Sequence, residues 1–400
     1  MTVLFGARAH LCKFPFIARI WQPDKGLTEY GLYSFPRLRK GNGTLPTAFL
    51  RFCRIRAEIP IEKLGILCYD RGAGRIANDP PGFCEENFEV LYMIDFHRLA
   101  LGEKAAYDKL LMTCPPRGCE YSFANLFFWG LQKIAFFPEC AVFFSHFRGR
   151  SVYPYPIGTG NKREAVERVL LDARERGLPC RFVCLSASDV QELESWFPGK
   201  FFFRPDRDGF DYVYDINDLA DLKGRKFQKK RNHLHRFLDA HPEAQVQPLT
   251  GELRERGRHF AARWYQNRKQ SDPHGDYLLE EVAMGRAFRH YDDLGLEGIA
   301  LTEGDTILAL SIGSPLSPDT FDIHFEKADE TVEGAYTAIN QAFARYLRDK
   351  YPALRYLNRE DDMGLAGLRK AKLSYCPHHM EEKYWAYLQD EGLWEDGDAL

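Results

Sequence analysis

The sequence has no long hydrophobic run. No stretch of the 400 residues approaches the roughly 18 consecutive apolar residues that a membrane-spanning helix needs. The start of the chain is interrupted by Arg8, His10, Lys13 and Arg19, and these charges spoil the apolar core of a secretory signal. We therefore expect a cytoplasmic protein without a transmembrane segment.

The cysteines show no organised pattern. Ten are scattered along the chain, and the closest pairs are Cys114/Cys119 and Cys180/Cys184. Neither pair has two further Cys or His residues nearby at the spacing of zinc ligands. Reduced thiols are expected, and the sequence predicts no metal site.

The net charge is small, at −3. A protein that holds nucleic acid through its bulk charge is strongly basic, so this chain can meet a polyanion only through a local patch. Its length and its 45% hydrophobic content are typical of a globular protein with two or three domains.

One basic patch is present between Lys223 and Arg236, which enclose seven Lys/Arg and two His. Asn217 and Asp218 are good helix N-caps, so the sequence predicts a basic helix over 218–240.

A helical wheel divides the cations of this helix into two sets. The set inside or beside the apolar arc is Lys223, Lys226 and Lys230, and the set pointing away is Arg225, Lys229 and Arg236. Two interpretations are open: the inner lysines extend past the core into solvent, or they line a cleft that binds a polyanion.

The order of elements predicts two similar domains. Residues 1–92 show no lasting period and are either an upstream extension of the reading frame or an irregular extra module. After Met93 the order is strand, two helices, three strands, helix, strand, helix and strand, and it returns after the basic helix. We predict an α/β (α+β) fold with domains at 93–217 and 241–400, joined by the helix 218–240. Each domain would have a mixed, mostly antiparallel sheet flanked by helices.

This element order resembles the Gcn5-related N-acetyltransferase (GNAT) fold, and two copies resemble aminoacyl-tRNA-dependent transferases. Three strings, PPRGCEYSFANLFFWG, FDYVYDINDLADLKGRKFQKKRNHL and LNREDDMGLAGLRKAKLSYCP, are similar to soluble relatives of the phosphatidylglycerol lysyltransferase C-terminal domain (DUF2156). The resemblance covers about residues 93–388. It implies transfer of an aminoacyl group from charged tRNA, as co-substrate, to a lipid, peptide or small-molecule acceptor, with no other cofactor.

Charged residues follow an apolar strand near the end of the chain. Asn358 closes the strand, and Arg359, Glu360, Asp361 and Asp362 come next. The C-terminal end of a strand in an α/β layer is where ligand sites collect. A solvated turn with local ion pairs would give the same pattern.

Aminoacyl transfer needs a base for the acceptor and charge stabilisation for the ester oxygens. We predict Glu360 or Asp362 as the base, with the other as its orienter. Arg369 or Lys372 would bind the oxyanion or the terminal phosphate, and the resemblance points to Lys372. The predicted tRNA- or substrate-binding residues are Lys223, Lys226, Lys230, Arg231, Asn232, Asn358, Arg359, Tyr212, Tyr336 and Tyr375. The three tyrosines could stack a terminal adenine or belong to the core.

The alternative donor is acetyl-CoA, whose pyrophosphate needs a bare backbone at a helix N-terminus. In the second half, Glu330 and Glu333 would repel it. In the first half, Gly158, Gly160 and Lys162 could hold a phosphate, although Gly-X-Gly is also an ordinary turn. A non-catalytic tRNA- or peptide-binding protein is a third possibility.

Overall fold

The computed structural model describes residues 93–114, 118–147, 149–272 and 277–389, together with five strands earlier in the chain. The chain divides into two compact units, residues 1–93 and 94–400. In the first unit, β1 (Phe16–Gln22) pairs with β2 (Gly26–Tyr33). There, β3 (Cys68–Asp70) also pairs with β4 (Arg75–Ala77) and β5 (Phe88–Glu89). Whether residues 1–92 are an upstream extension or an extra module remains a prediction, because most of this segment lies outside the described residues.

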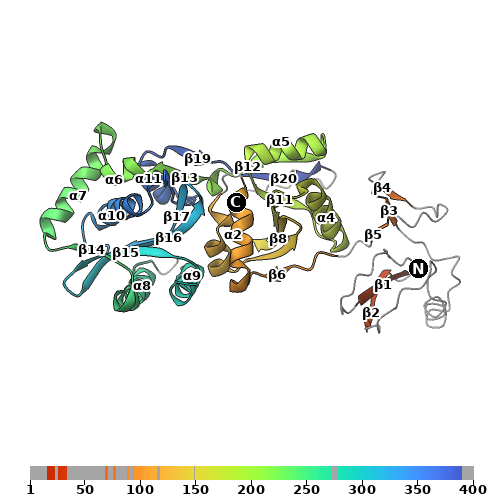
Figure 1. Cartoon of the computed structure of the whole chain (residues 1–400), viewed down its shortest axis with the longest axis horizontal. Coiled ribbons are helices and arrows are strands. Elements are labelled where there is room, and N and C mark those ends of the chain that lie inside the picture. The colour runs from red at the N-terminus through yellow and green to blue at the C-terminus, as the bar shows by residue number, and fades with distance from the viewer. Residues whose placement is uncertain are drawn as a thin grey trace. The chain divides into compact units, whose positions relative to one another are not determined.

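The second unit contains two sheets with helices on their faces (Figure 1). The elements of its first half are β6 (His97–Arg98), η2 (Leu101–Glu103), α2 (Lys104–Thr113), η3 (Cys119–Tyr121), α3 (Phe123–Trp129), β7 (Gln132–Phe137), β8 (Cys140–Phe147), β9 (Arg150–Pro154), β10 (Ile157–Gly158), α4 (Lys162–Glu175), β11 (Arg181–Leu185), α5 (Ala187–Trp196), β12 (Phe201–Pro205) and η4 (Arg207–Gly209). The strand expected over 93–99 is reduced to β6.

The remaining elements follow in the same order. They are β13 (Asp211–Asp215), α6 (Ile216–Asp221), η5 (Arg225–Phe227), α7 (Gln228–Ala240), β14 (Gln245–Pro248), α8 (Gly251–Ser271), α9 (Leu278–Arg289), β15 (Glu297–Glu303), β16 (Thr306–Ser317), β17 (Thr320–Ala328), α10 (Ala335–Lys350), β18 (Tyr356–Asn358), α11 (Ala366–Leu373), β19 (His379–Glu381) and β20 (Tyr384–Leu388).

The two sheets have matching topologies. The first has the order β6-β7-β8-β9-β11-β20-β12, and the second β14-β15-β16-β17-β18-β13-β19. Each sheet has one parallel pair, β9 with β11 and β17 with β18, and its other neighbours along that order are antiparallel. A helix, α4 or α10, connects the strands of each parallel pair. This confirms the predicted fold class of two tandem GNAT-like halves.

Each half contributes one strand to the sheet of the other half. β13 follows β12 in the chain but lies between β18 and β19 in the second sheet. β20 follows β19 but lies between β11 and β12 in the first sheet. The predicted boundaries at 217 and 241 therefore assign both strands to the wrong half. The chain crosses between the sheets at residues 206–210 and again at 382–383.

The basic segment does not run between the halves as one helix. Leu222 and Gly224 have positive φ angles of 49° and 84°, and they separate α6 from η5 and α7. Both α6 and α7 pack on α10, at the end of this unit far from α4 and α5 (Figure 1). The expectation of a connecting helix over 218–240 is wrong, because the chain has already entered the second sheet at β13 and the left-handed turn breaks the segment into separate helices.

One core joins the two halves. Tyr107, Phe123 and Phe128 from the first half belong to the same buried cluster as Phe260 and Phe325 from the second. Burial of large aromatic side chains is strongly stabilising, so the two sheets hold their interface rigidly. Within the part of the chain that the structure describes, no helix combines the length and apolarity needed to cross a bilayer.

Candidate active site

The two crossing segments meet at a buried ion pair. Asp211 begins β13, Lys383 precedes β20, and Lys383 Nζ lies 2.7 Å from Asp211 Oδ1. Both residues are buried. Glu120 of η3 adds a second carboxylate, 2.6 Å from the same ammonium. The strand exchange thus brings charges from three distant parts of the sequence into one network.

Asp211 is the most fully bonded carboxylate of this network. Its Oδ2 accepts hydrogen bonds from Asn358 Nδ2 (2.9 Å) and from the Cys119 backbone N–H (2.7 Å). Burial alone would raise the pKa of Asp211, but Lys383 and these donors overcome it and lower the pKa. The same carboxylates raise the pKa of Lys383 against the effect of burial. The pair is therefore ionised at neutral pH.

The segment after β18 forms a strained loop beside this pair. Glu360 has a φ of 57°, and its N–H donates to Asn358 Oδ1 at 2.7 Å. Lys372 Nζ donates to the backbone carbonyls of Arg359 and Asp361. Non-glycine residues in the left-handed region are strained and persist where the surroundings fix them. Two of the three donors of Lys372 are therefore committed to this loop.

Asp361 has the protonation behaviour of a general base. Its side chain is partly exposed. Burial, opposed by Lys383 and Lys372 and reinforced by Asp211 and Glu360, raises its pKa to about 7. A base is most effective when its pKa lies near the working pH.

The predicted base Asp362 has a different environment. Its Oδ1 and Oδ2 lie 2.8 Å and 2.9 Å from Arg369 Nη2 and Nε, and Tyr212 Oη donates to Oδ2 at 2.5 Å. Although burial raises the pKa of Asp362, the bonds from Arg369 and Tyr212 lower it overall. Arg369 also contacts Asp208. This arrangement disfavours Asp362 as a base and makes Arg369 a clamp on the loop.

A second acidic cluster lies next to the loop. His324 Nδ1 is 3.2 Å from Glu360 Oε1 and 3.4 Å from Asp322 Oδ2. Ile312 pairs with Phe325 and Gly313 with Ile323, which leaves His324 as the extra residue of a β-bulge. Bulges re-aim side chains and are frequent beside active sites. Burial and the neighbouring carboxylates Glu360 and Asp211 raise the pKa of Asp322 well above its usual value.

The three predicted stacking tyrosines occupy different environments. Tyr212 and Tyr375 are buried, whereas Tyr336 is 38% exposed. The Tyr375 ring lies 3.6 Å from Lys230 Nζ and 4.9 Å from the Arg359 guanidinium carbon. Of these three rings, Tyr336 alone is accessible for stacking with a nucleobase. The Tyr375 ring instead contacts two cations, Lys230 and Arg359. Burial, with the charge of Arg359, lowers the pKa of Lys230 to about 8.

Four further predicted tRNA-binding residues, Lys223, Lys226, Arg231 and Asn232, lie on α7 or in the segment just before it. Lys223 and Lys226 are exposed and pair with Asp221 and Asp218, which agrees with the interpretation that these lysines extend into solvent. Arg231 donates to the Leu222 and Gly224 carbonyls and thereby fixes the left-handed turn. Asn232 is exposed and accepts from Gln228.

The glycines considered for CoA pack against backbone. A Cβ atom on Gly158 would lie 2.2 Å from the Glu139 carbonyl oxygen, and one on Gly160 would lie 2.3 Å from that of Pro138. Lys162 is paired with Glu192 at 2.5 Å. In the second half, a Cβ on Gly334 would meet the His233 carbonyl oxygen of α7 at 2.3 Å. The N–H groups of Gly158 and Gly160 already donate to Cys114 Sγ and to the Glu139 carbonyl.

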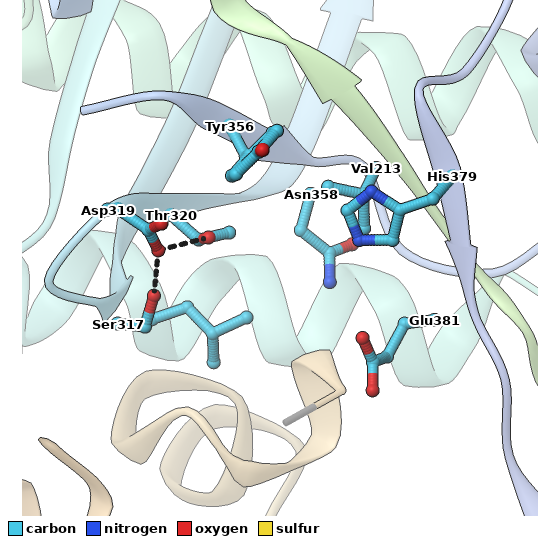
Figure 2. A pocket seen from close by; sticks show the side chains of 9 residues that line it. Val213, Ser317, Asp319, Thr320, Tyr356, Asn358, His379 and Glu381 are labelled. Carbon is cyan, nitrogen blue, oxygen red and sulfur yellow. Dashed lines mark hydrogen bonds between the residues drawn. The ribbon is translucent and has the colours of Figure 1, made fainter. Parts of the chain in front are cut away.

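A small pocket adjoins the network at Asn358 (Figure 2). Val213, Tyr356 and His379 also line it, and Asp319 accepts hydrogen bonds from Ser317 and Thr320 on its other side. Its volume of about 70 Å³ is far below the several hundred Å³ of most small-molecule sites. This pocket does not hold a nucleotide.

Sequence reasoning missed several members of the site. They are Asn125, Cys119, Glu120, Asp211, Asp322, His324 and Lys383. A signal existed for Asp322 and His324, because polar residues alternate with apolar ones in TFDIHF and must share one face of a strand. Nothing local marks Lys383, whose partners are brought to it by the strand exchange.

Comparison with known proteins agrees with this architecture. A crystal structure of a conserved protein of unknown function from Bacteroides thetaiotaomicron is 34% identical, covers 74% of this chain and 100% of that chain, and superposes with a TM-score of 0.69. The structure of L-PGS from Bacillus licheniformis is 14% identical, covers 73% of this chain and 93% of that chain, and shares the fold with a TM-score of 0.54.

A curated relative, an uncharacterised protein of Mycoplasmoides gallisepticum, is 27% identical over 175 residues. That match covers 43% of this chain and 54% of the relative, so the chain spans about half the length of the curated protein it matches. Residues 112–387 match the family described as phosphatidylglycerol lysyltransferase, C-terminal. Since this match includes strands of both sheets and most of the chain, the protein belongs to the phosphatidylglycerol lysyltransferase C-terminal domain family.

Proposed function

We propose that the protein transfers an aminoacyl group from charged tRNA to an acceptor at the loop 358–362. The observation that carries this proposal is Asp361, a carboxyl group with a pKa of about 7 beside two lysines, in a chain of this family. The acceptor belongs to one of three classes, a lipid, a peptide or a small molecule.

The reaction needs few groups because an aminoacyl ester is already activated. Asp361 accepts the proton of the acceptor nucleophile as that nucleophile attacks the ester carbonyl. The new acyl–acceptor bond forms, the ester C–O bond breaks, and the leaving ribose oxygen takes up the proton that Asp361 accepted. Lys372 holds the Arg359 and Asp361 carbonyls, so that the base is fixed relative to the substrate.

Acetyl-CoA is less suited as the donor. The turns at Gly158 and Gly334 are packed against backbone, and Lys162 is already paired. A tRNA can instead be held by exposed cations, such as Arg225 and Lys229 near the start of α7. These observations favour aminoacyl-tRNA over CoA and leave a tRNA-binding protein without catalysis as the second candidate.

The first test is transfer of label. Purified protein is incubated with cell extract and either radiolabelled aminoacyl-tRNAs or labelled acetyl-CoA, and the lipid, peptide and small-molecule fractions are counted. We expect label from aminoacyl-tRNA in one fraction. Label from acetyl-CoA alone would contradict the proposal, and binding of charged tRNA without transfer would support the non-catalytic candidate.

The base is tested by Asp361→Asn. The rate of transfer should fall by about 10²-fold or more, the usual contribution of a general base. Because the base must be deprotonated, the wild-type rate should rise as the pH increases through about 7. The residual rate of the variant should not show this rise. Asp349→Asn, at a highly exposed position of α10, is the control and should keep both rate and profile. If the transfer rate of Asp361→Asn still rises with pH as the wild-type rate does, Asp361 is not the base.

A further inference from the structure

The cluster of Asp322, His324 and Glu360 is not used by the transfer chemistry. We propose that it binds one divalent ion of the first transition row through a carboxylate oxygen of Asp322, Nδ1 of His324 and Oε1 of Glu360. This inference goes beyond the proposed function and does not depend on it.

The geometry of the three ligand atoms fits a shared ion. They all lie within 4.8 Å of one another. His324 Nδ1 is 3.2 Å from Glu360 Oε1 and 3.4 Å from Asp322 Oδ2. Metal–ligand bonds of about 2.0–2.2 Å place neighbouring ligand atoms about 3 to 3.5 Å apart in tetrahedral or octahedral coordination. The side chains therefore need little movement to enclose an ion.

Asp322 supplies the independent evidence for a ligand. Its side chain is fully buried, and neither carboxylate oxygen has a hydrogen-bond partner among the described residues. An unpaired buried carboxylate is strongly unfavourable. A proton on His324 Nδ1 can be donated to one carboxylate, Asp322 or Glu360, whereas a divalent ion bonds to both and to the ring nitrogen.

The surroundings resemble the support that metal ligands usually have. His324 Nε2 lies 2.8 Å from Ser314 Oγ, and Asn125 Nδ2 donates to Glu360 Oε1 at 3.1 Å. Such contacts fix the orientation of ligating side chains. The Phe128 ring packs against the imidazole in a T-shaped arrangement, with the ring centroids 5.0 Å apart.

A neighbouring group of possible ligands is already filled. Cys119, Glu120 and Asp211 are also close together, but Lys383 is bonded to both of these carboxylates. Burial and the charge of Asp211 raise the pKa of the Cys119 thiol, so it does not supply a thiolate. No lysine or arginine is within ion-pair distance of Asp322 in the described part of the chain.

The ligand set indicates the kind of metal. One imidazole and two carboxylates suit zinc, manganese or iron better than calcium or magnesium, which prefer oxygen alone. Three protein ligands leave at least one position for water or substrate. The sequence predicts no metal because its cysteines and histidines lack ligand spacing, whereas these ligands come from β17 and from the loop after β18.

The test is metal binding by the full-length protein. After treatment with a chelator, the protein is titrated calorimetrically with Zn²⁺ and Mn²⁺, and its Tm is measured with and without each ion. We expect saturable binding of about one ion per chain and a rise in Tm, because a ligand of the folded state stabilises it. Asp322→Asn and His324→Ala should weaken binding by at least about tenfold, since even loss of supporting contacts costs that much. The matched control Cys119→Ser should bind as the wild type does.

Absence of saturable binding to the stripped wild type overturns the proposal, as does unchanged affinity in both variants. A loss confined to Cys119→Ser would assign the ion to the other cluster and also overturn it. The Tm of each variant measured without metal shows whether a loss of binding comes from misfolding. In the stripped state Asp322→Asn replaces a buried carboxyl group that has no hydrogen-bond partner with a neutral amide of similar size, so the variant should melt at or above the wild-type Tm. A variant that unfolds there shows that the carboxylate itself supports the fold, and the proposal fails.

Discussion

The pKa values of two neighbouring aspartates, Asp211 and Asp361, are shifted in opposite directions. Both are affected most by burial, which raises a carboxyl pKa. Asp211 additionally receives Lys383, Asn358 and a backbone N–H, and its pKa falls. For Asp361, burial and the charges of Asp211 and Glu360 outweigh the charges of Lys383 and Lys372, and its pKa rises to about 7. The charge of Lys383, together with the hydrogen bonds to Asp211, thus separates this structural carboxylate from the proposed base Asp361.

The structural role of Asp211 can be tested by Asp211→Asn. The variant leaves Glu120 as the carboxylate in contact with Lys383, and breaking a buried pair costs about 3–5 kcal/mol of unfolding free energy. The folded pKa of Asp211 is lowered, so its contribution is present above the unfolded value of about 3.9 and is lost as the pH falls through the folded value. Urea unfolding of wild type and variant should therefore differ at neutral pH and converge below about pH 4.

The control for this measurement is Asp218→Asn. Asp218 pairs with Lys226 at the surface, where the two side chains are 36% and 49% exposed. Such a pair contributes under about 1 kcal/mol. Equal small losses in the two variants would mean that the buried pair is not a major source of stability.

At the scale of elements, prediction succeeded where capping and periodicity agree. Asn161 accepts a hydrogen bond from the Glu164 N–H at the start of α4, and Val166, Val169 and Ala173 follow at helical spacing and are buried. The helix predicted over 218–240 is wrong because the chain turns at Leu222 and Gly224, so that one helical wheel does not apply across them. A glycine after a short apolar helix is a stop signal, and the residues beyond it start a new helical phase.

Because the helix restarts after Gly224, the cations expected to bind tRNA differ from those that the single helical wheel selects. Arg225 and Lys229 are exposed, whereas Lys230 is half-buried over the Tyr375 ring. The double variant Arg225→Ala/Lys229→Ala should weaken tRNA binding and reduce its salt dependence by up to about two units of slope, because each cation that neutralises a phosphate adds roughly one unit. Filter binding across a salt series measures this slope.

Lys230→Ala serves as the comparison for the double variant. It should leave the salt slope unchanged and lower stability by about 0.5–2 kcal/mol, because the cation–π interaction with Tyr375 is removed. A larger loss of tRNA binding in Lys230→Ala than in the double variant would restore the cleft that the helical wheel predicted.

At the scale of the whole molecule, the site exists because the halves exchange strands. Asp211 and Lys383 lie at the two crossings, and Asp206 reinforces them by donating its N–H to the Lys383 carbonyl and accepting from the Trp385 indole. The sequence could identify β13 and β20 as strands. It could not assign them to a sheet, because both strands are short and the choice of sheet depends on pairing partners far away in the chain.

The exchange predicts that the last strand stabilises the first sheet and not the second. A chain ending at Lys383 keeps the ammonium but lacks β20, whose Ala386 and Tyr387 are buried and whose residues pair with both β11 and β12. Loss of one large buried aromatic side chain alone costs roughly 3–5 kcal/mol. Because β20 is the neighbour that joins β12 to the sheet, hydrogen exchange should show loss of amide protection in β12 and β11. Protection in β15, β16 and β17 should persist. A chain ending at Gln389 is the matched control and should exchange like the full chain. Undiminished protection of β12 in the shorter chain, or equal loss in both sheets, would contradict the assignment of β20 to the first half.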